Sequence, residues 1–120
     1  MKKYSLEWNH LINKEKILGL LGIASKTKKI VFGKVALRNY ISKKYFKNKL
    51  VIISVDCGKT VKQDIIKRCD SYNVSYIIPD FLTKEILSKT IGKENVSILG
   101  VTEDNLINGI IATVNNGGDE

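Results

Sequence analysis

The chain has 120 residues, of which 43% are hydrophobic and 27% are charged, and its formal net charge is +8. These values are typical of one soluble globular domain that is long enough to bury a core, and no run of about 18 apolar residues predicts a membrane span. The two cysteines, Cys57 and Cys69, have no second pair and the chain has one histidine, which argues against a Cys/His zinc site.

We therefore expect two reduced thiols, no metal and no cofactor. The first residues of the chain lack the apolar segment of a secretory signal, so the expected location is cytoplasmic and no membrane partner is expected.

Apolar periodicity, capping residues and β-branched runs predict alternating helices and strands. The predicted helices cover residues 14–25, 34–44, 61–72, 84–91 and 103–114. The predicted strands cover residues 29–32, 50–55, 74–78 and 96–101. This order predicts an α/β fold, a three-layer α/β/α sandwich around a four-stranded mixed sheet. We expect one domain over residues 14–114, with a short N-terminal extension over 1–13 and a flexible tail over 115–120.

Residue types that commonly cap helices mark the predicted helix ends. The predicted N-caps are Asn13, Thr60, Thr83 and Thr102. The predicted left-handed C-cap is Asn73, and Gly92 is expected to end the fourth helix.

Charge is distributed unevenly along these elements. Residues 26–49 contain nine Lys or Arg and no acidic residue, whereas residues 94–120 contain five acidic residues and no basic one. Such asymmetry indicates an anionic partner that meets one side of the molecule. Nucleic acid is the leading class of partner, and a basic face that only contacts solvent is the alternative.

Catalytic chemistry has little support in the sequence. Gly58–Thr60 resembles the end of a P-loop, but Ile53 stands where the earlier glycine is required. Asp56 follows a predicted strand, as catalytic carboxylates do in many α/β folds, yet no second carboxylate or metal ligand is near it in sequence. A carboxylate that satisfies turn amides is the simpler interpretation. We predict that the protein is not an enzyme.

The strand-to-helix turn at Gly33 is the predicted binding site. A helix N-terminus offers free N–H groups and a positive end, and a glycine there lets a phosphate approach the backbone closely. Lys34 and Arg38 are four residues apart and share one face of the helix. Arg38 and Asn39 can also donate to base edges. The alternative is that Gly33 makes only a tight turn and that the nearby lysines only contact solvent.

Several segments occur in the order found in a known family of RNA-binding proteins. They are Leu18–Ala24, Lys29–Gly33, Leu50–Asp56, Cys69–Ile77, Ile86–Glu94 and Val101-Thr102. Together they resemble the kink-turn-binding ribosomal proteins, and most of all the small bacterial YlxQ-type members. The resemblance covers about residues 14–114. It implies a cytoplasmic, non-enzymatic α/β/α protein that binds structured RNA, with ribosomal RNA and the ribosome among the candidate partners.

The resemblance also implies where RNA binds: the turn into the second helix and the loop after the fourth. The family pattern at the turn is Gly-x-Asn-Glu-x-x-Lys, and residues 33–39 here read GKVALRN. Val35 and Ala36 therefore replace the Asn and Glu that pair with the sheared G·A bases of a kink-turn, and Asn39 replaces the Lys. The loop maps to Gly92–Val96, where Glu94 is unfavourable for a phosphate.

These departures favour RNA binding through phosphate contacts and shape. A protein-interaction adaptor on the same fold is the alternative, with an acidic last helix and exposed Trp8, Tyr45 and Phe46. A substrate-recognition domain that serves a separate catalytic chain is a third hypothesis. The predicted RNA-binding residues are Lys26, Lys28, Lys29, Gly33, Lys34, Val35, Ala36, Arg38, Asn39, Gly92, Lys93 and Asn95.

Overall fold

The computed structural model of the chain describes residues 3–6 and 11–118. The helices in this part are α1 (Leu11–Lys26), α2 (Lys34–Ser42), α3 (Lys59–Tyr72), α4 (Lys84–Ile91) and α5 (Asp104–Gly118). The strands are β1 (Lys3–Leu6), β2 (Ile30–Phe32), β3 (Leu50–Ile53), β4 (Ser75–Pro79) and β5 (Ile98–Val101). None of these helices is long and apolar enough to cross a membrane.

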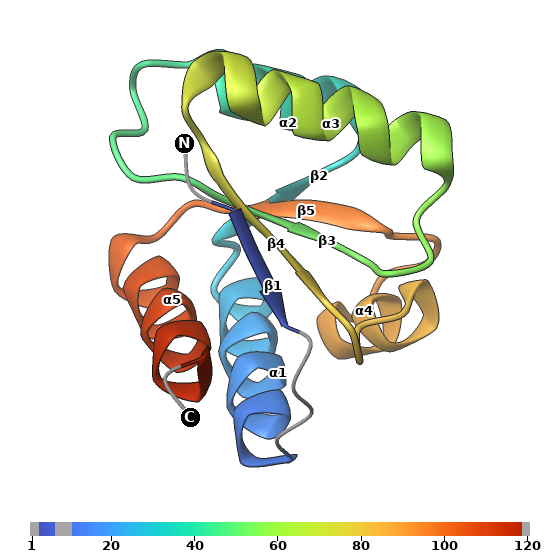
Figure 1. The fold of residues 1–120 in the computed structure, drawn as a ribbon, viewed down its shortest axis with the longest axis vertical. Coiled ribbons are helices and arrows are strands. Elements are labelled where there is room, and N and C mark those ends of the chain that lie inside the picture. Colours follow the sequence, from blue (N-terminus) through green and yellow to red (C-terminus); the bar gives the residue numbers. More distant parts are fainter. Residues whose placement is uncertain (1–2, 7–10, 119–120) are drawn as a thin grey trace.

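The strands form one mixed sheet in the order β1-β4-β3-β5-β2. The pairs β1·β4 and β4·β3 are parallel, whereas β5 runs antiparallel to both β3 and β2. Helices α2 and α3 cover one face of the sheet, and α1, α4 and α5 cover the other (Figure 1). The predicted three-layer α/β sandwich with a mixed sheet is confirmed.

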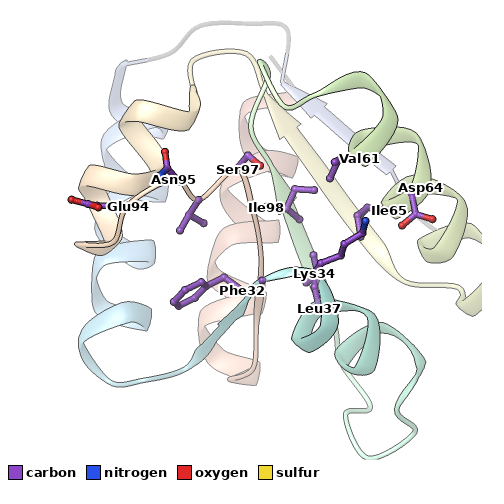
Figure 2. Close-up of a pocket in the computed structure, with 12 residues that line it drawn as sticks. Phe32, Lys34, Leu37, Val61, Asp64, Ile65, Glu94, Asn95, Ser97 and Ile98 are labelled. Carbon is purple, nitrogen blue, oxygen red and sulfur yellow. The ribbon is translucent and has the colours of Figure 1, made fainter.

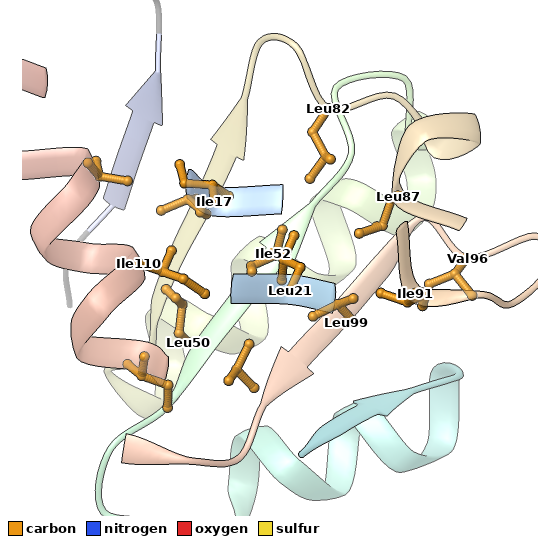
Figure 3. Close-up of a cluster of buried hydrophobic side chains, with 14 residues drawn as sticks. Ile17, Leu21, Leu50, Ile52, Leu82, Leu87, Ile91, Val96, Leu99 and Ile110 are labelled. Carbon is orange, nitrogen blue, oxygen red and sulfur yellow. The ribbon is translucent and has the colours of Figure 1, made fainter. Parts of the chain in front are cut away.

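The central strand β3 supplies both layers of the core. All four of its residues are buried, and their side chains alternate between the two faces, as the pleat of a strand requires. Leu50 and Ile52 join the cluster beneath α1, α4 and α5 (Figure 3). Val51 and Ile53 join the second cluster, beneath α2 and α3. The β-branched run was therefore correctly interpreted as a strand buried on both faces.

The sheet contains one strand more than the four that were predicted. β1 lies at its edge and pairs in parallel with β4, from Lys3 opposite Tyr76 to Leu6 opposite Pro79. The predicted N-terminal extension includes these residues, because KYSL has no apolar run that would mark a strand. The pairing depends on the open edge of β4, which becomes apparent only once the sheet is assembled.

Three helix ends follow the predicted capping chemistry: both ends of α4 and the C-terminal end of α3. The Thr83 hydroxyl accepts a hydrogen bond from the Ile86 N–H at 3.2 Å at the start of α4, and Gly92 ends this helix with φ of 71°. Asn73 ends α3 in the left-handed conformation with φ of 58°. These ends are predictable because their chemistry is local.

Other predicted ends are wrong. α1 begins at Leu11, so Asn13 lies inside the helix, and α3 begins at Lys59 with Gly58 as its N-cap, ahead of Thr60. At α5 the Glu103 carboxylate accepts the Leu106 N–H at 2.9 Å, so the capping group is one residue later than the predicted Thr102. α5 also continues to Gly118, so residues 115–118 of the predicted tail are helical.

Candidate nucleic-acid interface

The N-terminus of α2 is open. Gly33 is its N-cap, with φ of 91° and ψ of 146°, and within the described part of the chain no side chain makes a capping hydrogen bond there. The first amide to donate within the helix is that of Leu37, to the Gly33 carbonyl at 2.9 Å. The amides of residues 34–36 precede this bond, and all three residues are exposed. An anion at this end would meet backbone donors and the positive end of the helix dipole.

Gly33 is required by its conformation. Apart from its two chain neighbours, no described residue has an atom within 4 Å of a Cβ built at this position, so space does not select the glycine. The positive φ of 91° does, since side-chain-bearing residues rarely adopt it. The glycine therefore fixes the direction in which β2 enters α2.

The N-terminus of α4 offers a contrast. There Thr83 caps the helix, Glu85 is an acidic residue in its first turn, and the Asp56 carboxylate accepts the Lys84 N–H at 2.7 Å. This hydrogen bond is the main cause that lowers the pKa of Asp56 below its usual value. The interpretation of Asp56 as a carboxylate that satisfies backbone amides is supported. The chain's own side chains thus satisfy backbone amides at the N-terminus of α4. At α2 the first turn contains no acidic residue.

The turn at Gly33 opens onto a pocket of about 250 Å³ between α2, α3 and the loop after α4 (Figure 2). Its lining residues are Phe32, Gly33, Lys34, Leu37, Val61, Asp64, Ile65, Glu94, Asn95, Val96, Ser97 and Ile98. The turn and the loop, which the family resemblance predicted as two parts of one site, therefore lie side by side. Of the predicted binding residues, Gly33, Lys34 and Asn95 line the pocket.

Exposed apolar residues line this pocket at Phe32 and Val61 and follow its lining residue Lys34 at Val35. Val35 is 72% exposed, Val61 is 41% exposed and Phe32 is 38% exposed. Val35 and the exposed Ala36 stand at the start of α2 without a hydrogen-bonding group in their side chains. The surface can therefore donate from the backbone but cannot read base edges with these two positions.

Arg38 is directed to a protein partner. Its guanidinium lies 3.2 Å from the Asp64 carboxylate of α3, and Arg68 lies 3.2 Å from the same oxygen. Arg68 first, and Arg38 with it, lower the pKa of Asp64. Asp64 was not predicted from the sequence, where the one available signal was its spacing of four residues from Arg68. Arg38 was predicted to face RNA together with Lys34. The Asp64 carboxylate partly neutralises the positive charge of Arg38.

The basic residues that precede β2 lie apart from the Gly33 turn. Lys28 and Lys29 line a different hollow, with the α2–β3 loop and the start of α5. Three strand residues at about 3.3 Å each separate the two ends of β2 by roughly 10 Å. Lys26 is the last residue of α1, two residues before Lys28. The predicted set of residues therefore divides between two surfaces.

The remaining predicted residues are exposed but do not line the pocket. Asn39 lies on α2, and Gly92 and Lys93 lie in the loop after α4. Lys93 shares a shallow hollow with Lys84 and Glu94. Among the residues whose placement is described, no group of three or more His, Cys, Asp or Glu side chains could hold a metal ion.

The aromatic residues predicted to be exposed differ from one another. Tyr45 is 83% exposed. Phe46 is partly buried, because its ring centroid lies 5.2 Å from that of the buried Tyr40. Trp8 lies outside the described residues.

Comparison with known proteins identifies the fold and the family. The chain is 27% identical over 93 residues to the RNA-binding protein YlxQ of Bacillus subtilis, a match that covers 78% of this chain and 89% of that protein. Among solved structures, a protein of unknown function from Bacillus halodurans has a TM-score of 0.72 at 24% identity, and covers 83% of this chain and 97% of its own.

The Giardia lamblia 15.5kD RNA binding protein has a TM-score of 0.68 at 15% identity, and covers 92% of this chain and 93% of its own. The two structures share the fold with this chain. Residues 15–109 match the profile of one protein family, which is most of the chain and includes both parts of the site. The chain belongs to the ribosomal protein L7Ae/L30e/S12e/Gadd45 family.

Proposed function

We propose that the chain is a non-enzymatic RNA-binding protein that holds structured RNA at the strand-to-helix turn around Gly33. The observation that carries the proposal is the open N-terminus of α2, whose exposed first turn lies beside the loop after α4. Family membership supports it, as do the names of two relatives, the RNA-binding protein YlxQ and the 15.5kD RNA binding protein.

A phosphate is the group that fits this end of α2. The amides of residues 34–36 supply donors, the helix dipole supplies a partial positive charge, and Lys34 adds a full charge at the same place. Glu94 and Asp64 line the pocket behind the turn, so a phosphate fits best on the solvent side of Lys34 and Val35. Lys93 and Asn95 extend the contact across the loop.

Recognition then depends on the RNA backbone and on its shape. Side chains at positions 35 and 36 cannot bond to the sheared G·A bases of a kink-turn, because valine and alanine lack donors and acceptors. Each missing base-edge contact is worth about 1–3 kcal/mol of discrimination. We therefore expect this protein to favour structured RNA, ribosomal RNA included, without strong selection for kink-turns, and to act in the cytoplasm.

The test is a fluorescence titration of the full chain with a kink-turn RNA and with ribosomal RNA fragments, across a salt series. Binding should weaken steeply as salt rises, because phosphate contacts release counterions. The proposal is wrong if the wild-type chain binds neither RNA near about 50 mM salt, where such contacts are strongest.

Val35→Glu locates the contact. A carboxylate in the first turn of α2 repels a phosphate but is favourable for the helix, so binding should fall by about 10- to 100-fold while the melting temperature stays the same or rises. Ala112→Glu is the matched control, since Ala112 is an exposed helical residue of α5 on the other face of the sheet. Equal losses in the two variants would move the contact away from α2.

A protein-binding function is the second candidate, and one observation favours it. The apolar edge formed by Phe32, Val35 and Val61 could equally accept an apolar side chain of another protein. Affinity capture that survives nuclease treatment and is lost on Val35→Glu would support this function. Capture lost to nuclease would support RNA.

A further inference from the structure

A second basic surface lies at the end of β2 away from Gly33. The α1–β2 turn, the α2–β3 loop and the start of α5 enclose a hollow of about 900 Å³. The residues used below are Lys28, Lys29, Tyr45, Lys47, Glu103 and Asp104, and we call this surface the Tyr45 groove. We propose that the Tyr45 groove binds an unpaired RNA strand, and that a base of this strand stacks on the ring of Tyr45.

Tyr45 is held out into solvent by a well-anchored loop. Tyr45 is 83% exposed, the largest value among the exposed large hydrophobic residues in the described part of the chain. The Phe46 ring supports it edge-on at 5.1 Å and itself packs on buried Tyr40. An aromatic ring presented in this way is ready to stack without further ordering of the chain, which lowers the cost of binding.

Two hydrogen bonds fix the same loop to its neighbours. The Asn48 amide donates to the Asn108 side chain of α5 at 3.2 Å, and the Lys49 ammonium donates to the Ile41 carbonyl at the end of α2 at 2.9 Å. The exposure of Tyr45 is therefore a property of a loop tied to α2 and α5.

Exposed lysines lie on the loop that carries Tyr45 and on the α1–β2 turn that lines the same groove. Lys43, Lys44 and Lys47 are exposed in the same loop, and Lys28 and Lys29 are exposed in the facing turn. Aromatic rings interleaved with cations are the combination that binds single-stranded nucleic acid, since bases stack while phosphates are neutralised. Bases within a helix are already stacked on their neighbours, so an exposed ring selects unpaired nucleotides.

Two carboxylates line the groove at the start of α5. Glu103 uses its carboxylate to cap α5 at Leu106, and Asp104 stands in the first turn of that helix. In this proposal they repel a polyanion from the start of α5, so the strand contacts the lysines of the groove. The inference rests on the proposed function, which supplies the RNA. An unpaired strand that extends from a structured RNA bound at Gly33 can run along β2 to this groove.

Three RNA probes separate the two surfaces. They are a structured RNA without a tail, the same RNA with a tail of about ten uridines, and a free strand of about ten uridines, a length within the usual site size of single-strand binders. The tail should increase the affinity of the wild-type chain. Tyr45→Ala should weaken binding of the tailed RNA and of the free strand by about 5- to 140-fold and leave the tailless RNA unaffected.

Two further tyrosine variants act as controls. Tyr45→Trp keeps a stacking ring and should bind like the wild type. Tyr72→Ala removes a tyrosine that is 53% exposed on α3 and lies beside Lys67 and Arg68, so it tests whether any tyrosine near cations has the same effect. The melting temperature of each variant is measured as well. Removing an exposed ring should leave it unchanged, so a loss of binding cannot then be attributed to unfolding.

The lysines are tested by the salt dependence of free-strand binding. Replacing Lys43, Lys44 and Lys47 together with alanine should reduce the slope by about two, since each single-strand phosphate contact contributes about 0.7. Replacing Lys16, Lys67 and Lys89, exposed lysines of α1, α3 and α4, removes the same charge elsewhere and should reduce the slope by less.

The outcomes distinguish this proposal from the one at Gly33. Tyr45-dependent binding of the free strand without binding of the tailless RNA supports the Tyr45 groove and contradicts the Gly33 site. If the wild-type chain binds the tailless RNA, and neither the tail nor Tyr45→Ala changes its affinity, the Gly33 site is supported and the Tyr45 groove is contradicted. The inference is also overturned if a poly-glutamate peptide displaces the free strand as well as unlabelled RNA does, since the groove would then be a site for acidic protein segments.

Discussion

The two ends of β2 present different chemistry although they belong to one basic stretch of sequence. At the Gly33 end, backbone amides and an apolar pocket dominate, and the charge of Arg38 is shared with Asp64. At the Tyr45 groove, exposed lysines line the same hollow as an exposed tyrosine. Residues 26–49 carry nine cations, yet the short strand divides them between surfaces roughly 10 Å apart.

This difference separates two requirements of RNA binding. Lysines with free charges supply affinity that depends on salt but carries little geometric information. A helix N-terminus beside a pocket imposes direction, because its donors point along one axis. We infer that the Gly33 end positions the RNA and that the Tyr45 groove retains it.

The largest expected effect comes from disabling both ends together. On the tailed RNA, Val35→Glu combined with Tyr45→Ala should multiply the two single losses, because changes more than about 7–10 Å apart combine additively to within about 0.5 kcal/mol. A double-mutant cycle by fluorescence titration measures the interaction energy between the two sites. A value well above about 1 kcal/mol would show that they act as one surface.

A gain of specificity should be next in size. Val35→Asn with Ala36→Glu restores two residues of the family pattern, so affinity for a kink-turn RNA should rise at least tenfold, at about 1–3 kcal/mol for each base contact. The control RNA has Watson–Crick pairs in place of the sheared G·A pairs and should show no gain. Equal gains on both RNAs would argue against base readout at these positions.

Helix α2 leads from the Gly33 turn to the loop that carries Tyr45, and a change in its buried face should have a smaller effect, on stability. The buried Tyr40 hydroxyl donates to the Val101 carbonyl and accepts the Leu50 N–H at 2.9 Å, which ties α2 to β5 and β3. Tyr40→Phe leaves both backbone groups without this partner and should cost about 1–3 kcal/mol in urea unfolding. Tyr72→Phe, at an exposed tyrosine, is the control and should change nothing.

The smallest effect should follow release of Arg38. Asp64→Asn removes the carboxylate that Arg38 and Arg68 share, so binding of the tailless RNA should strengthen by a few-fold and its salt slope should steepen by up to about one. Adding Arg38→Ala to this variant should cancel the gain. A gain that persists without Arg38 would assign it to Arg68 or to the lost negative charge.

Local chemistry made much of the fold predictable from the sequence. The spacing of Leu37, Tyr40 and Ile41 identified the buried face of α2, and Thr83 and Gly92 marked the ends of α4. These features depend on residues within one or two turns of each other. The juxtaposition of the Gly33 turn with the loop after α4 was available from the family resemblance.

Features that depend on distant segments were not predictable. Arg38 is directed to Asp64, which lies 26 residues away on another helix. The separation of the lysines from Gly33 depends on the direction of a strand only three residues long. The partial burial of Phe46 depends on contact with Tyr40, which the loop sequence does not reveal.

The edge strand β1 has a consequence for how the molecule assembles. Its partner β4 comes from the second half of the chain, so the two can meet only after β4 has been made and positioned by β3. Contacts between such distant segments slow folding, because a long loop must close before they form. We expect β1 to dock last in refolding, so that hydrogen exchange in β4 is protected in two kinetic phases.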